Sequence, residues 1–334
     1  MTDQRRLGRS GIGVSALGIG TWAIGGPMYG PDGSPSGYGR VDDDESRSAL
    51  RRAVELGVTL FDTAQAYGTG HAEEVLGEAL APVRDQVVIA TKWGNAIDPA
   101  TRRITGQDTS PEQLRTSLHE SLRRLRTDHV DVYQLHVNGL PPEQAVDLVP
   151  VCEELVEQGL VRTYGWSTDN PAGAAAMAAA GPRFAVVQHE LNVLSDLRPG
   201  SAAAQLLEVC ERFDLAALNR SPLAMGLLSE KVTAGSRFDA DTVRGTAPEW
   251  LAWFRDGGPA PEFLARRDAV RDVLTSGGRT LAQGALAWIW AVSPRTVPLP
   301  GCRTVAQVEE NAGALAHGPL SPEQVREVAD LLAR

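Results

Sequence analysis

Lysine is nearly missing from this 334-residue sequence, in which Lys92 and Lys231 are the only two and all other cationic residues are arginines. A lysine retained in such a chain is more often there for a specific purpose than for surface charge. The 42 acidic residues outnumber the 32 basic ones, giving a net charge of -10. This balance argues against nucleic acid as the main partner, but it does not exclude a small anionic ligand.

Cysteine is also scarce, and long hydrophobic runs are absent. Cys152, Cys210 and Cys302 are widely spaced, so they match neither a disulfide framework nor a zinc site, and we expect no bound metal. Residues 1–10 are polar, unlike a signal peptide, and no run of ~20 apolar residues could span a membrane. We therefore expect a cytoplasmic protein with no membrane partner.

Eight short apolar segments predict the fold. With 43% hydrophobic residues the chain can build a large core, and continuous apolar strands are typical of parallel sheets buried on both faces. We interpret as strands residues 16–21, 58–61, 86–91, 130–135, 160–166, 184–187, 215–218 and 296–299. We interpret as helices residues 43–56, 72–82, 142–158, 171–180, 201–213, 262–275 and 281–292, and the segments capped by Ser110, Thr304 and Ser321. Ser110 to Gln113 is expected to form a capping box, and Thr280 with Gln283 and Ser321 with Gln324 are expected to cap their helices.

This alternation predicts a single domain, residues 1–334, with a (β/α)8 barrel fold, an N-terminal β-hairpin and extra C-terminal helices. The alternative is an open doubly wound sheet, but no Gly-x-Gly-x-x-Gly motif follows an early strand. Two segments, 25–40 and 246–262, have no regular pattern, and long irregular loops are often functional.

Polar residues recur where the predicted strands end: Asp62, Lys92, His136, Ser167, Gln188 and Ser221. In a barrel these ends form one face, which carries the active site. Each residue alone has a plainer interpretation, such as a helix-capping aspartate, a surface lysine or a core histidine. Their recurrence at strand ends favours a common site.

Four of these side chains suggest a chemistry. The pKa of a tyrosine is ~10, and a nearby ammonium group such as that of Lys92 lowers it. Asp62 would hold the lysine, and His136 would polarise a carbonyl oxygen. Tyr67 could then protonate a developing alkoxide, which fits carbonyl reduction with hydride from a cofactor.

Over nearly its whole length the sequence resembles the aldo-keto reductases, including the branch related to potassium-channel β subunits. The resemblance rests on Leu7–Gly11, Gly18–Trp22, Phe61–Ala64, Tyr67-Gly68, Thr91-Lys92, Leu135-His136, Gly165–Ser167, Gln188, Ser221–Leu223, Gly226–Leu228, Pro300-Gly301, Gln307, Glu310 and Asn311. It implies a (β/α)8 barrel, NADPH as cofactor, and catalytic roles for Tyr67, Lys92, Asp62 and His136.

The resemblance also implies a cofactor site. Its expected residues are Gly20, Thr21, Trp22, Asp62, Ser167, Thr168, Gln188, Arg220, Ser221, Pro222, Leu223, Gly226, Leu228, Lys231, Gly301, Arg303, Gln307, Glu310 and Asn311. Arg303 precedes a helix N-terminus, where a 2′-phosphate would bind well, so NADPH is favoured over NADH. Thr168 and Arg220 depart from the common pattern, which has asparagine and an aromatic residue there.

For the substrate, a small carbonyl compound, we expect a pocket lined by Trp22, Tyr29, Tyr67, Trp93 and His136. The cluster of Trp250, Trp253 and Phe254 either joins this pocket or packs within a helix. Two alternative functions remain: a cofactor-binding regulatory or partner subunit, and a specialised ketoreductase for sugar nucleotides. No feature of the sequence marks an oligomer interface.

Overall fold

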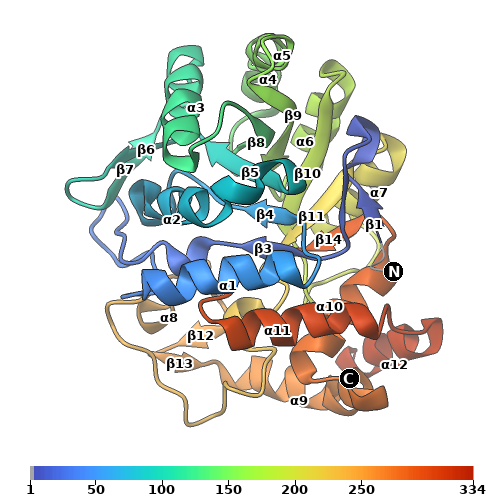
Figure 1. The fold of residues 1–334 in the computed structure, drawn as a ribbon. Helices are drawn as coiled ribbons and strands as arrows, with labels where there is room; N and C mark the ends of the chain where they lie inside the picture. Colours follow the sequence, from blue (N-terminus) through green and yellow to red (C-terminus); the bar gives the residue numbers. More distant parts are fainter. Residues whose placement is uncertain (1–3, 334) are drawn as a thin grey trace.

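Eight parallel strands form the centre of the protein, which is described here by a computed structural model covering residues 4–333 (Figure 1). In spatial order they are β3 (Gly18–Gly20), β4 (Leu60–Asp62), β5 (Val88–Trp93), β8 (Val130–Leu135), β9 (Val161–Ser167), β10 (Phe184–Glu190), β11 (Ala216–Arg220) and β14 (Thr296–Pro298). The Gly20 amide donates to the Pro300 carbonyl at 3.0 Å, which joins the two ends of the sheet. The predicted barrel is confirmed, and the open doubly wound sheet is wrong.

Helices surround the barrel, one or more after nearly every strand. They are α1 (Asp43–Glu55), α2 (His71–Leu80), α3 (Pro111–Leu125), α4 (Pro142–Val146), α5 (Val149–Glu157), α6 (Pro171–Ala180), α7 (Ala202–Arg212), α8 (Val243–Thr246), α9 (Pro261–Thr275), α10 (Leu281–Val292), α11 (Val305–Gly313) and α12 (Pro322–Leu332). The extra C-terminal helices that the sequence predicts are present, and α9 and α12 pack against each other and against α10 (Figure 1).

Two local expectations about helices are corrected. The single helix expected over 142–158 is two helices, because Pro150 has no amide hydrogen and its ring clashes with the carbonyl four residues earlier. Ser110 caps α3, but the side chain of Gln113 donates to Ser117 instead of closing a capping box. The boxes at Thr280 and Ser321 are complete.

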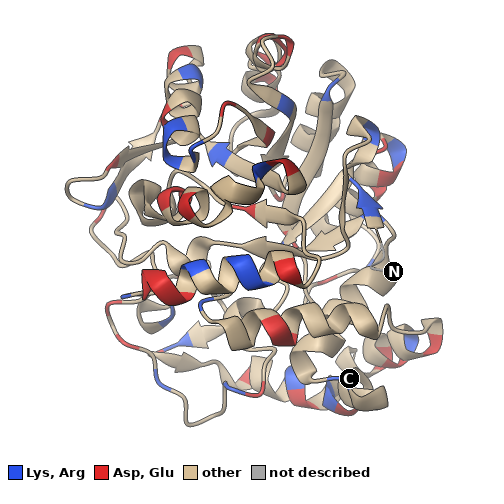
Figure 2. Ribbon diagram, viewed as in Figure 1, with Lys and Arg blue, Asp and Glu red and all other residues tan. Residues whose placement is uncertain are grey.

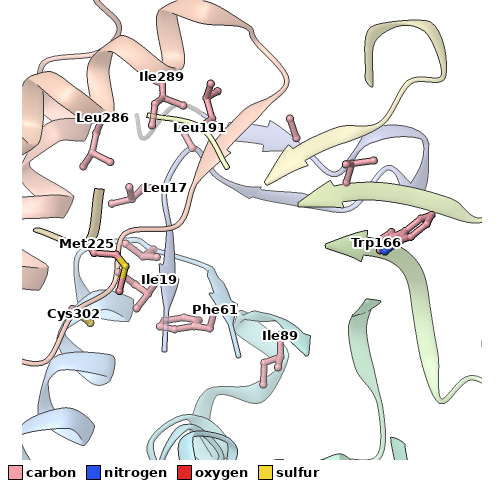
Figure 3. Packing of buried hydrophobic residues seen from close by; sticks show 14 of the residues in the cluster. Leu17, Ile19, Phe61, Ile89, Trp166, Leu191, Met225, Leu286, Ile289 and Cys302 are labelled. Atoms are coloured by element: carbon pink, nitrogen blue, oxygen red, sulfur yellow. The ribbon is translucent and has the colours of Figure 1, made fainter. Parts of the chain in front are cut away.

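The strands alternate between two apolar cores. One side faces the barrel interior, where Leu60, Val88, Val132, Val186 and Leu218 form one cluster. The other side faces the helices, where Phe61, Ile89 and Trp166 join the larger cluster drawn in Figure 3. Successive side chains of a strand point to opposite faces, so this alternation fixes which strand residues can reach the interior.

Smaller elements cover the two ends of the barrel. The expected N-terminal hairpin, β1 (Gln4–Arg6) with β2 (Gly13–Ser15), is present, and Arg9 between them donates to the carbonyl of Phe184. A second hairpin, β6 (Asn95–Asp98) with β7 (Arg103–Gln107), follows β5 and was not expected. A third, β12 (Phe254–Arg255) with β13 (Gly258–Pro259), lies in the long segment before α9.

Charged residues lie mainly on the outer helices and loops, and the barrel strands carry few (Figure 2). Across residues 4–333, every helix is too short or too polar to cross a membrane. The same part of the chain contains no group of three or more His, Cys, Asp or Glu side chains suited to a metal ion.

Candidate active site

The register of the strands explains why polar side chains meet at one end of the barrel. Asp62 lies two residues after Leu60, and Lys92 lies four residues after Val88, so each follows an interior-facing residue at even spacing. Gln188 and Arg220 follow Val186 and Leu218 in the same way. The structure therefore brings together three of the strand-end residues that the sequence singled out, Asp62, Lys92 and Gln188.

Lys92 lies at the centre of the four side chains for which the sequence suggested a chemistry. Its side chain is completely buried, and its ammonium group donates to Asp62 Oδ2 at 2.6 Å, to the Thr63 carbonyl at 2.8 Å and to Tyr67 Oη at 3.2 Å. These three bonds use all three ammonium protons. Since Tyr67 Oη accepts from Lys92, the phenol's own hydrogen is directed elsewhere, and Tyr67 lines the cleft.

The second oxygen of Asp62 is held by two amides. Gln188 Nε2 donates to Asp62 Oδ1 at 2.7 Å, and Gln134 Nε2 donates to it at 3.2 Å. The sequence analysis missed Gln134, although its signal was available. It lies two residues before His136 and two after Val132, on the interior side of β8.

A close approach of two backbone segments places Tyr67. Gly68 has a φ of 60°, and a Cβ there would lie 1.8 Å from the carbonyl oxygen of Gly25. The Gly68 amide also contacts Met28 Sδ at 3.3 Å. Only glycine fits this position, so the Tyr67-Gly68 pair fixes the phenol against segment 25–40.

Burial and neighbouring charges have opposite effects on the pKa values of Tyr67 and Lys92. Burial raises the pKa of Tyr67 more than the Lys92 ammonium lowers it, so the net direction is upward, contrary to our expectation. Burial lowers the pKa of Lys92, but Asp62 and Tyr67 outweigh it and raise the pKa overall. Tyr67 therefore remains a phenol, and Lys92 a cation, across the neutral range.

His136 is neutral under the same conditions. Burial, Lys92 and Arg220 together lower its pKa to about 3. The imidazole meets the Tyr67 ring edge to face, with ring centroids 5.9 Å apart. A neutral imidazole can donate one hydrogen bond to a bound oxygen without competing with Tyr67 to supply the proton.

A cleft of about 1170 Å³ opens above these residues. Nearly all of the expected cofactor residues line it: Gly20, Thr21, Trp22, Asp62, Ser167, Gln188, Arg220, Ser221, Pro222, Leu223, Gly226, Lys231, Gly301, Arg303, Gln307, Glu310 and Asn311. Tyr67 and His136 line it as well. Lys92 does not, because it lies beneath Tyr67.

The cleft wall that follows β11 and β14 fits an anionic ligand. Lys231, Arg244 and Arg303 all line it, and the buried Nε of Arg244 has no hydrogen-bond partner among residues 4–333. Ser221, Ala224 and Met225 have positive φ values of 55°, 45° and 52°. Such strained backbone outside glycine is typical of ligand-binding turns, and the donor set suits the phosphates of a dinucleotide. The sequence analysis missed Arg244.

Four expected site residues lie elsewhere. Trp93 is 1% exposed and stacks on Tyr133 in the core, because it follows Lys92 directly and so faces the helices. Tyr29 pairs by its backbone with Pro35 and Arg103, and the adjacent Met28 lines the cleft instead. Thr168 is buried, and its hydroxyl donates to the carbonyl of Asn138. Leu228 is buried in the larger core.

The aromatic cluster near residue 250 is divided between the cleft and the core. Trp250 is 64% exposed, lines the cleft and stacks on Trp22 with ring centroids 6.4 Å apart. Trp22 in turn stacks on Tyr67 at 6.0 Å. Trp253 and Phe254 are buried in the larger core, so only Trp250 is available to a ligand.

Arg220 occupies a position at which the sequence analysis noted that an aromatic residue is common. Its guanidinium forms ion pairs with Asp169 and with Glu190, the latter at 3.0 Å. The side chain is fixed by these two carboxylates on the cleft wall, and its charge acts on His136.

Comparison with known proteins gives a consistent family assignment. The model of the aldo/keto reductase family matches residues 16–333. The NADH-specific methylglyoxal reductase of Escherichia coli is 30% identical, with 98% of each chain covered. The chloroplastic pyridoxal reductase of Arabidopsis thaliana is also 30% identical, over 94% of this chain and 82% of that protein.

Solved structures show the same fold. The glycerol dehydrogenase of Gluconobacter oxydans superposes with a TM-score of 0.80 at 28% identity, covering 100% of this chain and 96% of that one. An aldo/keto reductase from Klebsiella pneumoniae, in complex with NADP and acetate, gives a TM-score of 0.69 at 25% identity, covering 99% and 96%.

Proposed function

The chain belongs to the aldo/keto reductase family, and we propose that it reduces the carbonyl group of a small aldehyde or ketone to an alcohol, with Tyr67 as the proton donor. As a member of this family it is a nicotinamide-dependent oxidoreductase. One observation carries the proposal for Tyr67: the buried Lys92 ammonium donates to Tyr67 Oη at 3.2 Å and leaves the phenol's own proton free for the cleft.

The proton transfer follows from this arrangement. As negative charge develops on the carbonyl oxygen, the Tyr67 hydroxyl delivers its proton, and Lys92 stabilises the phenolate that forms. Asp62 holds the ammonium in place at 2.6 Å. The Gln134 and Gln188 amides bind the other oxygen of Asp62, so the carboxylate keeps one orientation.

His136 orients the carbonyl group. Its imidazole is neutral, lines the cleft and lies edge to face with the Tyr67 ring. A ring N–H directed into the cleft donates to the same oxygen that Tyr67 protonates. Two donors on one oxygen fix its position and stabilise the charge that develops there.

The cofactor supplies the hydride when bound. Ser167 and the Oε1 of Gln188 are suited to hold a carboxamide, since the Nε2 of Gln188 is already engaged by Asp62. The turn from Ser221 to Gly226 and the side chain of Lys231 would hold the phosphates.

We assign NADPH as the preferred cofactor because several cations line the cleft wall after β11 and β14. Arg303 lines the cleft immediately before α11 and is anchored by the carbonyls of Tyr38 and Arg40. Arg244 lies over the Phe238 ring at 4.1 Å, with its Nε unpaired. Glu310 is an acidic residue on the same wall, so the excess of positive charge favours a third phosphate.

The test is a spectrophotometric assay with NADPH and then NADH against a panel of aliphatic and aromatic aldehydes and ketones. The proposal predicts turnover with NADPH and weaker turnover with NADH. Tight NADPH binding without turnover of any carbonyl compound would contradict it and would favour a cofactor-binding subunit.

A further inference from the structure

The side chain of Asn95 contacts His136, and the proposed reduction assigns no role to this contact. It is the first residue of β6 and follows Gly94, whose φ of 110° turns the chain sharply away from β5. A Cβ at Gly94 would lie 2.9 Å from Val137 Cγ2, so this turn brings the chain tightly against the residue after His136. Gln65 Nε2 donates to the Asn95 carbonyl at 2.7 Å and holds the backbone there.

The side-chain amide of Asn95 meets two groups of His136. Its Nδ2 lies 3.4 Å from the His136 carbonyl oxygen and 3.4 Å from the ring nitrogen Nδ1. A carbonyl oxygen only accepts hydrogen bonds, so the amide group facing it must be the NH2 and not the oxygen. The orientation of the amide is thereby determined by chemistry.

The same NH2 group then sets the state of the ring. An amide nitrogen has two hydrogens and no capacity to accept, so Nδ1 must accept from it and carry no hydrogen. In a neutral imidazole the single hydrogen must then be on Nε2, which has no hydrogen-bond partner among residues 4–333. We propose that Asn95 is a positioning residue that holds His136 in the Nε2–H tautomer, with that hydrogen available to the cleft.

The tautomer matters for carbonyl recognition. A neutral imidazole with its hydrogen on Nδ1 would present a lone pair at Nε2 and repel a substrate oxygen, whereas the Nε2–H tautomer donates to it. The hydrogen bond made by one ring nitrogen commonly fixes the chemistry of the other. The effect on catalysis rests on the proposed function, but the tautomer itself does not.

The charged and titratable groups around His136 are consistent with a neutral ring. Lys92 of β5 and Arg220 of β11 are the cations whose charges reach it, and Tyr67 contacts it edge to face. Both cations disfavour a second positive charge, and burial acts in the same direction. An uncharged amide at Nδ1, unlike a carboxylate, therefore leaves the His136 ring neutral.

His189 provides an internal reference with the opposite arrangement. Its Nδ1 lies 3.1 Å from the Glu190 carbonyl oxygen and must donate to it, while Asn219 Nδ2 lies 3.4 Å from Nε2. The same reasoning gives His189 the Nδ1–H tautomer. The two neutral histidines should therefore give different signals in one spectrum.

The direct test is long-range ¹H–¹⁵N correlation NMR of the ¹⁵N-histidine-labelled protein at pH 7. The chain has six histidines, and the spectra of His136→Gln and His189→Gln assign the two signals. We expect the Nε2–H pattern for His136 and the Nδ1–H pattern for His189. A Nδ1–H or imidazolium pattern for His136 in the unmodified protein overturns the proposal, whether or not the protein reduces any carbonyl compound.

Two substitutions test the role of the amide. In Asn95→Asp the carboxylate can only accept, so the hydrogen should move to Nδ1 and the pKa of His136 should rise toward the ordinary range. In Asn95→Leu the donor is removed at similar volume. For both we expect kcat to fall by about 10–100-fold, by analogy with the loss of a partner that orients a metal-bound histidine, with the Kd for NADPH unchanged.

The pH profile separates positioning from structural damage. In the unmodified protein, titration of His136 should not change kcat between pH 5 and 8. In Asn95→Asp, kcat should change with pH around ~6.5, the ordinary pKa of histidine. Thr105→Asp, which adds a carboxylate to an exposed position of the same hairpin outside the cleft, should keep the original profile and kcat. An Asn95→Asp variant with unchanged tautomer and pH profile would contradict the proposal.

Discussion

The Nζ atom of Lys92 lies 3.2 Å from the hydroxyl oxygen of Tyr67 and 2.6 Å from Oδ2 of Asp62, inside the barrel and without exposure to solvent. A buried ammonium is stable only when it is paired and hydrogen-bonded, and here every proton is used. The arrangement therefore stabilises the charge on Lys92 and at the same time directs the phenol's proton toward the cleft.

Replacing Lys92 should affect both stability and turnover. Lys92→Met leaves Asp62 buried without its counter-ion, so the free energy of unfolding should fall by about 3–5 kcal/mol. Turnover of the folded fraction should fall at least ~100-fold, because no cation stabilises the phenolate. Urea unfolding and steady-state assays measure the two effects.

The only other lysine offers a matched control for stability. Lys231 is exposed, so Lys231→Met should change the free energy of unfolding by less than ~0.5 kcal/mol. An equal loss in both variants, or no loss in Lys92→Met, would contradict the account of the buried pair.

Acidification should destabilise the protein through His136 and His189, whose pKa values are lowered in the folded state. Burial lowers the pKa of His189 to about 4 and that of His136 to about 3, against ~6.5 in an unfolded chain. Between these pKa values the unfolded state binds more protons than the folded state. The stability that the two histidines contribute is therefore fully present above pH ~6.5 and is lost as the pH falls toward 4. Each histidine contributes a slope of up to about 1.4 kcal/mol per pH unit.

Replacing one of the two histidines should weaken the dependence of the unfolding free energy on pH. Urea unfolding of His189→Gln at pH 7.5, 6.5, 5.5 and 5.0 should show a smaller loss of stability than the unmodified protein. Since the side chain of His189 lies outside the cleft, the comparison does not depend on catalysis. Identical slopes would show that His189 is not held neutral by burial.

Arg303 should set the preference for NADPH. Arg303→Ala removes a cation from the cleft wall, so the KM for NADPH should rise by about ten- to a hundredfold, as expected for a charge-assisted contact. The KM for NADH serves as the control for any disturbance of residues 38–40, which Arg303 anchors. Equal increases in KM for NADPH and NADH would indicate that the 2′-phosphate does not bind at Arg303.

Trp250 should select for aromatic substrates. Its exposed ring continues the stack formed by Tyr67 and Trp22, so Trp250→Ala should raise the KM for benzaldehyde by about three- to tenfold. Propanal, which has no ring to stack, should be affected less than about twofold. A similar change for both substrates would mean that Trp250 only shapes its own loop.

The barrel and the convergence of Asp62, Tyr67, Lys92 and His136 could be predicted because two signals coincide at strand ends. The strand Val88–Trp93 is apolar from Val88 to Ala90, and the period of two puts Lys92 on the same side as Val88 and Ala90. The same period, applied to the next residue, would have excluded Trp93 from the pocket. That error came from treating the strand end as a loop.

Other parts of the site depend on contacts that have no local signal. The hairpin Asn95–Gln107 is polar, half-exposed and kinked by a change of register after Ala96, so nothing in its pattern indicates a strand. Tyr29 and Met28 are adjacent, and only the pairing of Tyr29 with Arg103 decides which of them faces the cleft. Arg244 likewise reaches the cleft through packing on Phe238 and Tyr38.

The central claim is that Tyr67 supplies the proton, and Tyr67→Phe tests it most directly. The variant keeps the ring that stacks on Trp22 and lies against His136 and removes only the hydroxyl group. With a good substrate and saturating NADPH, the single-turnover rate at pH 7 should fall by ~10²–10⁴-fold, while the Kd for NADPH stays the same. A variant that binds NADPH normally and keeps its rate within a few-fold of the unmodified protein would contradict the account.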